Sequence, residues 1–375
     1  MRAAWRTTWR TPVSAFAGSR ILYLLTVLAI PALTHKGRSF SKPWALFLRR
    51  ALFTSDGGWY YSIAVRGYDR VPFTIATQHN WTFFPLYPYL TRWVHQLTGA
   101  PVLWVGYAIS SLAFLGFLLV LHAWARRHLA ADTARVAILL AAFVPLTPYF
   151  VAYRAESLFL LLSVLSLDAI DRRRWAQALA WGAMASLTRP TGILLVVPYA
   201  IAVLLAGKGG RHRAAWLAGG AAFCTGFLVV AVIDRHVSGN ALAFLQGQQE
   251  WGKTVGVPFV SEIRDARSAH TFTAVVGIGS TLVVSAIGVA ATAWLARLRE
   301  WWPAAAYLGI TILLSNASTT YLAVPRFIVE VPALFVGLAL IAERYRWQYG
   351  LLLASAGAMG LYSALWTLGV KGVQV

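Results

Sequence analysis

The chain of 375 residues is 58% hydrophobic and only 12% charged, and its formal net charge at pH 7 is +20. A soluble domain usually has about twice that charged fraction, so the composition excludes an ordinary soluble protein and indicates an integral membrane protein. The basic residues lie in short loops beside apolar runs, which argues against nucleic acid as a partner. The only cysteine, Cys224, lies in an apolar run, so an intrachain disulfide is excluded.

The N-terminal segment 1–20 is basic and precedes the apolar run 21–33, an arrangement similar to a signal peptide. No small-residue cleavage site follows it, so we expect an uncleaved first helix. Apolar runs of about 20 residues are typical of transmembrane helices, and we expect about eleven of them. The expected spans are 18–34, 101–123, 133–151, 155–170, 175–188, 190–206, 214–233, 273–296, 303–319, 325–342 and 349–370.

The distribution of basic residues predicts the orientation of these spans. With the N-terminus in the cytoplasm, every short inner loop contains arginine, and the short outer connections are poor in charge. We therefore expect a multi-pass protein of the plasma (inner) membrane, with one transmembrane domain over 1–375. Two outer loops, 35–100 and 234–272, are long. Within the first of them, the mixed apolar and basic run 40–53 predicts a helix in the membrane interface.

The first outer loop contains the strongest candidate for catalysis, Asp56, in a chain with only 13 acidic residues. Two glycines follow Asp56, and then Trp59, Tyr60 and Tyr61. Ser-Asp-Gly-Gly also suits a simple turn. A sugar site, however, needs a carboxylate that accepts a hydroxyl proton and aromatic rings that stack on the sugar. We therefore expect Asp56 to be a general base, and Trp59, Tyr60, Tyr61 and Trp81 to bind substrate.

The same loop contains His79, which is followed by Asn80, Trp81 and the Phe-Phe-Pro-Leu-Tyr-Pro segment 83–88. The two prolines predict a rigid, extended entry into a helix. His79 could bind a substrate phosphate, orient Asp56 or bind a metal, and an ordinary hydrogen-bonding role is equally compatible with the sequence. No cluster of His, Cys, Asp or Glu has metal-ligand spacing. We predict neither metal nor other cofactor, although the sequence is compatible with a divalent metal.

Two arginines lie at the outer ends of expected spans. Arg189 precedes Pro190, a residue that suits the first turn of a helix. A helix N-terminus and a guanidinium group both favour an anion, so Arg189 is a candidate for binding a substrate phosphate, the role also open to His79. Arg326 is a third candidate of the same kind. Both arginines could instead extend to the interface as ordinary membrane-protein arginines, and we favour an ion pair between Arg326 and Glu330, four residues on.

Tyr153, Arg154 and Glu156 lie at the outer end of the third and fourth expected spans, 133–151 and 155–170. They could form a local ion pair or contact an acceptor. Charged residues near membrane depth are costly and therefore are functional candidates. We count all three among the candidate substrate-binding residues.

Several of these motifs together resemble the PIG-V family (GPI mannosyltransferase 2 family), which adds the second mannose of the GPI anchor and has many bacterial relatives. The more specific motifs are Asp-Gly-Gly-Trp-Tyr at 56–60, Ile-Ala at 63–64, Gly-Tyr at 67–68 and Phe-Phe-Pro-Leu-Tyr-Pro at 83–88. Weaker resemblances follow in the same order at 153–157, 187–192 and 324–327. The resemblance spans about residues 18–330, and the Ala, Arg and Trp content indicates a bacterial cell-envelope member.

This family belongs to the GT-C glycosyltransferases. The resemblance implies a multi-helix membrane fold, an active site on the extracytoplasmic face and a lipid-phosphate sugar donor. By motif position, Asp56 is the base, and we expect Arg189, Arg326 and His79 at the donor phosphate. The expected reaction is an inverting transfer of mannose from polyprenyl phosphate to a lipid- or glycan-linked acceptor within the membrane lipids. The alternatives are another lipid-linked sugar, such as glucose or arabinofuranose, and a lipid-linked sugar flippase or transporter.

Overall fold

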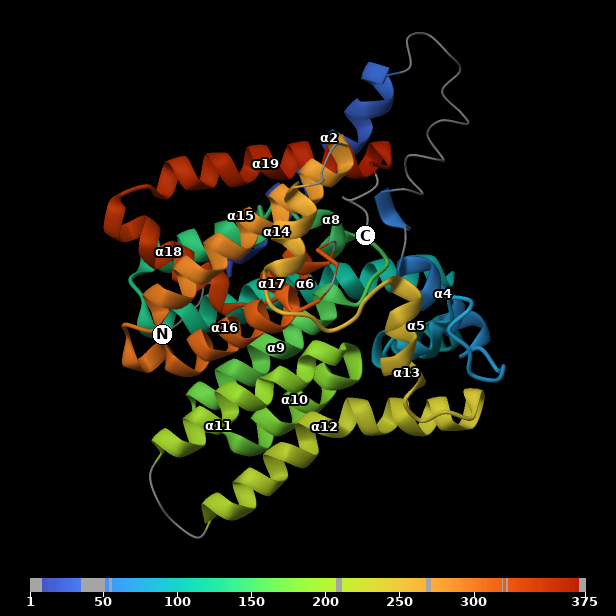
Figure 1. Cartoon of the computed structure of the whole chain (residues 1–375). Coiled ribbons are helices and arrows are strands. Elements are labelled where there is room, and N and C mark those ends of the chain that lie inside the picture. Colours follow the sequence, from blue (N-terminus) through green and yellow to red (C-terminus); the bar gives the residue numbers. More distant parts are fainter. Residues whose placement is uncertain are drawn as a thin grey trace.

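The computed structural model describes residues 9–34, 51–53, 56–206, 211–267, 271–318, 320–321 and 323–370, and every regular element within these ranges is helical (Figure 1). The expected all-α fold is therefore confirmed. Apart from its last three residues, the interfacial helix expected at 40–53 lies outside the described residues. The elements are α2 (Arg10–Thr34), α4 (Asp56–Arg66), η1 (Asn80–Thr82), α5 (Leu86–Thr98), α6 (Val102–His128), α7 (Ala131–Ala142), α8 (Thr147–Val151), α9 (Glu156–Asp171), α10 (Trp175–Thr188), η2 (Pro190–Leu195), α11 (Val196–Leu205), α12 (Arg211–Ser238), α13 (Ala243–Gln246), η3 (Gly247–Trp251), α14 (Val260–Arg267), α15 (Phe272–Leu295), η4 (Arg299–Trp301), α16 (Trp302–Asn316), α17 (Val324–Val329), α18 (Ala333–Tyr345) and α19 (Gln348–Leu368).

Among the described residues, five helices are long and apolar enough to cross a membrane. They are Arg10–Ile30, Val102–His128, Ala218–Ser238, Ala274–Leu295 and Gln348–Leu368. The chain is thus a membrane protein. The other expected spans coincide with shorter or interrupted helices, so the count of about eleven spans stays a prediction, as does the orientation.

Two of the expected spans are interrupted. The span expected at 133–151 is divided into α7 and α8, and the span expected at 325–342 is divided into α17 and α18. Pro332 directly precedes α18, and proline lacks the amide hydrogen that would continue the helix before it. Non-helical backbone at membrane depth is tolerated where it is buried inside protein, and Glu330 at this break is fully buried. The break therefore places a charged residue inside the bundle.

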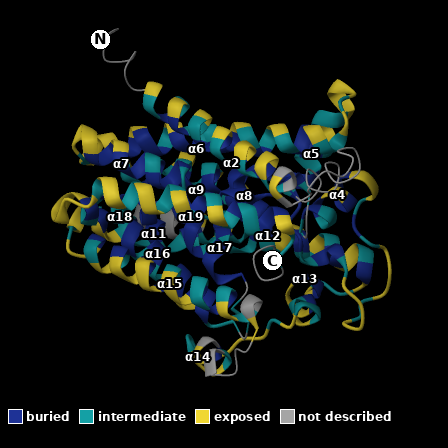
Figure 2. Cartoon of the chain, turned by 90° about the horizontal axis from the view of Figure 1, so that it is seen from above, coloured by how far each residue is buried: buried dark blue, intermediate teal, exposed yellow. Residues whose placement is uncertain are grey.

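The centre of the bundle is α9, in which twelve of the sixteen residues are buried. A helix that is apolar on all sides is typical of such a position. Helices α6 and α10 pack on α9, and α12 packs on α10 (Figure 1). Small residues allow α12 to approach α10 closely, because a Cβ atom at Gly226 would collide with the carbonyl oxygen of Ser186. Figure 2 shows that buried residues gather around α8, α9 and α17, with exposed residues at the periphery.

The two long segments predicted to be outer loops, 35–100 and 234–272 and called the outer segments below, meet in their described parts at one side of the bundle. The backbone N–H of Phe73 donates to the carbonyl oxygen of Ser238 at 3.0 Å, and η1 packs on both α13 and η3. Residues far apart in the chain therefore form one continuous cover over the ends of the central helices.

Candidate functional site

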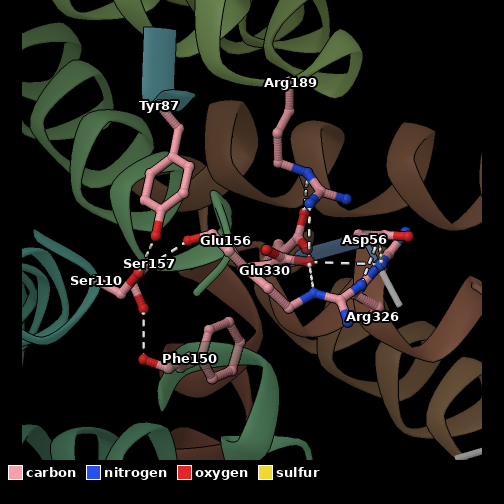
Figure 3. Close-up of polar contacts among 10 residues, drawn as sticks. Asp56, Tyr87, Ser110, Phe150, Glu156, Ser157, Arg189, Arg326 and Glu330 are labelled. Atoms are coloured by element: carbon pink, nitrogen blue, oxygen red, sulfur yellow. Dashed lines mark hydrogen bonds and ion pairs between the residues drawn. The ribbon is translucent and has the colours of Figure 1, made fainter. Parts of the chain in front are cut away.

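Six buried charged side chains from separate parts of the chain converge beneath this cover. Figure 3 shows Asp56 of α4, Glu156 of α9, Arg189 before η2 and Arg326 of α17 turned toward one another, with Glu330 beside Arg189. Arg154, which precedes α9, completes the group through its contacts with Asp56 and Glu156. The Asp56 side chain is 14% exposed, and the other five are 8% exposed or less.

Asp56 is the first residue of α4, where the helix dipole favours a negative charge. Its Oδ2 accepts hydrogen bonds from Arg154 Nη2 and Arg326 Nη1, each at 2.5 Å. Burial by itself would raise the pKa of Asp56, but Arg154 and Arg326 outweigh it and hold the pKa well below its usual range. The carboxylate is therefore ionised, and before a substrate binds it is a weak proton acceptor.

Glu156 connects all three arginines through one oxygen. Its Oε1 lies 3.2 Å from Arg154 Nε, 3.1 Å from Arg189 Nη1 and 3.5 Å from Arg326 Nη1. Such a contact is favourable only because the charges are mutually paired, since burying an unpaired charge is costly.

Glu330 forms its ion pair with Arg189, whose Nε lies 3.1 Å from Glu330 Oε2. The ion pair favoured from the sequence, between Arg326 and Glu330, is therefore not the one formed. The helical spacing itself is present, because Glu330 is the C-cap of α17 and its backbone N–H donates to the carbonyl oxygen of Arg326 at 3.3 Å. Arg326 instead reaches Asp56 and Glu156.

Aromatic rings hold the arginine side chains in position. The ring of Tyr149 lies 4.8 Å from Arg154 Cζ and 5.6 Å from Arg326 Cζ. The ring of Phe327 lies 5.5 Å from both Arg189 Cζ and Arg326 Cζ. These distances are within the range of cation–π interactions, so the guanidinium planes are fixed before any ligand arrives.

A polar cavity of about 90 Å³ lies over this charged cluster. Its lining includes the predicted base Asp56, the predicted substrate-binding residue Tyr60, and Arg189 and Arg326, which were predicted to bind phosphate. These roles stay predictions. The remaining lining residues are Thr82, Phe83, Phe84, Pro190, Gln248, Trp251, Lys253 and Phe327.

A second, mostly apolar cavity of about 240 Å³ adjoins the first. Phe84, Pro190, Gln248, Lys253 and Phe327 line both cavities. The remaining lining residues are Phe227, Phe244, Leu245, Leu314, Ser315, Ser318, Thr320, Ala323 and Val324. The site therefore has a charged chamber and an apolar chamber, with a lysine where they meet.

Lys253 and Trp251 are site residues that the motif reading missed. Both lie in the second long outer segment, in the run Gln-Gln-Glu-Trp-Gly-Lys at 248–253. The signal was the same as at Asp56, namely charged and aromatic residues beside a glycine in an outer loop. Burial and the neighbouring Arg326 lower the pKa of Lys253 to about 8, against the opposing effect of Asp56.

The predicted aromatic residues are divided between the cavity and its surroundings. Tyr60 lines the cavity. Trp59 lies one layer behind, stacked on Phe83 with ring centroids 6.0 Å apart. Tyr61 contacts Phe53 and Tyr153 instead. Tyr153 is fully buried and lies so close to α6 that a Cβ atom at Gly106 would collide with its ring. Of these four residues, the geometry thus favours only Tyr60 for direct contact with a substrate.

His79 and Trp81 join the two outer segments. His79 Nδ1 lies 3.3 Å from Asp69 Oδ2, and its backbone N–H donates to Glu250 Oε2 at 3.0 Å. The His79 ring stacks on Trp81 with centroids 4.2 Å apart. Neither residue is among the described residues that line the polar cavity. This position favours a role for His79 in holding the two segments together, and not the phosphate contact expected for it.

Within the described residues, no group of three His, Cys, Asp or Glu side chains is placed to hold a metal ion. The site carboxylates contact arginine. Independence from metal stays a prediction.

Residues 82–234 match the family of dolichyl-phosphate-mannose-protein mannosyltransferases, a segment that contains Arg154, Glu156 and Arg189. No protein of curated function matches the sequence. ArnT from Cupriavidus metallidurans bound to undecaprenyl phosphate is similar in structure over 95% of this chain and 71% of its own, with a TM-score of 0.53 at 16% identity. Its apo state has a TM-score of 0.52 at 16% identity over 96% of this chain and 77% of its own. The Archaeoglobus fulgidus oligosaccharyltransferase in complex with zinc and sulfate has a TM-score of 0.47 at 13% identity over 92% of this chain and 53% of its own.

The likeness to ArnT shows the fold of the chain. The chain is a membrane protein with the GT-C glycosyltransferase fold. The expected fold is therefore confirmed, whereas membership of the GT-C superfamily, the closer resemblance to PIG-V enzymes and the choice of mannose stay predictions.

Proposed function

We propose that this protein is an inverting glycosyltransferase that moves mannose from a polyprenyl phosphate to a lipid- or glycan-linked acceptor on the extracytoplasmic face. The observation that carries the proposal is the pair of adjoining chambers, one charged and one apolar, with Lys253 lining both. A lipid-linked sugar phosphate has matching parts, because its phosphate and sugar need polar partners and its tail needs an apolar surface.

The charge of the site suits a phosphodiester. Three arginines and three carboxylates balance one another, and Lys253 adds one positive charge at the cavity wall. We place the donor phosphate against Lys253, Arg189 and Arg326, and the first part of the lipid tail in the apolar chamber. A similar fold in ArnT, whose structure contains undecaprenyl phosphate, supports a carrier of this kind.

At the anomeric carbon, the proposed reaction forms one bond and breaks one, and one proton moves from the acceptor hydroxyl to Asp56. The acceptor oxygen attacks the anomeric carbon from the side opposite the phosphate, and the bond from that carbon to the phosphate oxygen breaks. The electron pair stays on the phosphate, which gains one negative charge that Lys253 and the arginines stabilise. The hydroxyl proton passes to Asp56.

Donor binding would also make Asp56 a stronger base than it is before the donor binds. In the structure, Arg326 directs Nη1 at Asp56, and this contact depresses the pKa of the carboxyl group. A phosphate that shares the charge of Arg326 would weaken this contact and raise the proton affinity of Asp56. The base would thus be activated only when the donor is in place, which limits reaction with water.

We expect donor affinity to fall as pH rises through about 8, because Lys253 then loses its proton. The sign follows from the lysine, which is charged below this pKa and neutral above it. Lys253→Gln should weaken donor binding about tenfold at neutral pH, the effect of one lost charge-assisted hydrogen bond. Calorimetric titration with polyprenyl phosphate across the pH range measures both effects.

Lys253→Arg is the matched control, since arginine keeps its charge at every accessible pH. This variant should bind donor with little dependence on pH. Affinity that falls through the same pH range in both the wild type and Lys253→Arg would show that another group titrates.

We expect Gly57→Ala to impair transfer and Gly58→Ala to leave it unchanged. A Cβ atom at Gly57 would lie 3.0 Å from the carbonyl oxygen of Tyr153, whereas at Gly58 it would meet nothing within 4 Å. The first substitution displaces the start of α4 and with it Asp56, and misplacement of a catalytic group by about 1 Å can cost 10²-fold in rate. Initial rates of both variants, with thermal unfolding as the folding control, test this difference.

The experiment that tests the function supplies purified protein in nanodiscs with membrane-extracted acceptors and labelled polyprenyl phosphate donors. Mannose, glucose and arabinofuranose donors are compared. Transfer of mannose above the others supports the proposal, and preferential transfer of another sugar keeps the chemistry but corrects the donor. Movement of an intact labelled donor across a sealed bilayer without any transfer would support a flippase instead.

A further inference from the structure

A second polar cavity, of about 160 Å³, lies at the opposite end of α9. Glu156 begins this helix and Asp171 ends it, so the two sites are separated by roughly 22 Å of helix. Trp124, Asp171, Arg173, Trp175, Arg299 and Trp301 are among its lining residues. The proposed glycosyl transfer uses none of them.

The charges of this cavity leave a cation in excess. Arg127 and His128 contact Asp171 at 2.8 and 3.0 Å. Arg127 also pairs with Asp168 at 2.7 Å, and Arg172 pairs with Asp168 at 3.1 Å, so these two arginines balance the two aspartates. Arg173 and Arg299 take part in no ion pair within the part of the chain that the structure describes, and the exposed Glu300 offsets one of them. One positive charge therefore remains for an anion.

The same cavity also contains a buried hydrogen-bond donor without a partner in the described part of the chain, the indole N–H of Trp124. The Trp124 side chain is 3% exposed, and its Nε1 has no hydrogen-bond partner among the described residues. A buried N–H without a partner costs free energy, and Trp124 is a lining residue of this cavity, so an acceptor on a ligand that reaches Nε1 would remove that cost. Trp124 and Trp301 also pack edge to face, with centroids 5.2 Å apart.

An open apolar groove of about 820 Å³ adjoins this cavity. Leu205 lines both, and the groove continues between α11, α15 and α16. Its residues face the outside of the bundle, with Leu204 66% and Leu313 50% exposed. In a membrane protein, such a surface contacts hydrocarbon chains.

We propose that this cavity and groove bind an anionic glycerophospholipid. The headgroup phosphate lies between Arg173 and Arg299 and accepts the hydrogen bond of Trp124, and an acyl chain follows the groove. Basic pockets between transmembrane helices are known to select anionic headgroups, and tryptophans are enriched at this depth of the membrane. The lipid would fix α9 at one end while the catalytic charges fix it at the other.

The test is native mass spectrometry of the delipidated protein with phosphatidylglycerol and with phosphatidylcholine of the same acyl chains. We expect about tenfold tighter binding of phosphatidylglycerol, and about tenfold weaker binding in an R173Q/R299Q double variant. The matched control is R126Q/R344Q, which removes the same charge from exposed residues that do not line the cavity. Ala306→Phe, which fills the groove, should weaken lipid binding and leave binding of glycerol 3-phosphate unchanged.

Three results would overturn the proposal. Equal affinities for the two lipids would exclude recognition of an anionic headgroup. Equal losses in the two double variants would show only general surface attraction. Binding of glycerol 3-phosphate as tight as that of the lipid would show a site for free phosphate compounds. These binding measurements do not depend on sugar transfer, so they stand whether or not the proposed function is correct.

Discussion

Asp56→Asn is expected to lower the rate of sugar transfer by about 10³-fold while the protein remains folded and binds donor, because a positioned general base contributes about 10² to 10⁴. The asparagine keeps the size of the side chain but removes its charge and its ability to take a proton. It also leaves three arginines opposite two carboxylates, so an incoming phosphate should bind as tightly as before or more tightly.

The measurement separates these two effects. Single-turnover transfer reports the chemical step, and donor titration reports binding. Asp132→Asn is the matched control, because the Asp132 side chain is 91% exposed and its partner is Arg135, outside the site. Unchanged turnover in a folded Asp56→Asn protein would remove Asp56 as the base and direct attention to Glu156.

The second large effect expected is a loss of stability in Glu156→Gln. One oxygen of Glu156 lies within 3.5 Å of all three buried arginines. An amide in its place can accept a hydrogen bond but does not neutralise charge, and breaking a buried ion pair in this way costs about 3–5 kcal/mol. We expect the free energy of unfolding in detergent to fall by this amount.

A phosphate ligand provides a specific check on this explanation. Polyprenyl phosphate adds an anion beside the arginines, so it should stabilise Glu156→Gln more than it stabilises the wild type. Glu343→Gln, at an exposed helical position, should change stability by no more than about 0.5 kcal/mol. An equal response of wild type and Glu156→Gln to the ligand would show that the loss of stability has another origin, such as packing.

The individual charged residues of the site could be found from the sequence because each is costly where it lies. Asp56, Glu156, Arg189 and Arg326 stand out as isolated charges at the ends of apolar segments, and a membrane protein retains such residues only for a reason. The structure brings all four together, although the donor and acceptor roles given to them remain proposals.

The partners of these residues could not be found in the same way. Arg326 and Asp56 are 270 positions apart, and no periodic pattern connects them. The local rule for charges four residues apart predicted Glu330 as the partner of Arg326. The helical spacing is present there, but the Arg326 side chain pairs instead with Asp56 and Glu156 from other segments. His79 was similarly judged by its neighbours in the chain, whereas its position depends on Glu250 of the distant second segment.

Composition and hydropathy by themselves determined that this is a helical membrane protein, because apolar runs with few charges can satisfy their backbone only as helices in lipid. They also determined which charged residues needed an explanation. Only the tertiary structure decided that three arginines share three carboxylates, that Lys253 and Trp251 join them, and that an apolar chamber adjoins the charged one. The physical reason is that pairing and burial depend on contacts between segments far apart in sequence, and those contacts exist only after the helices have packed.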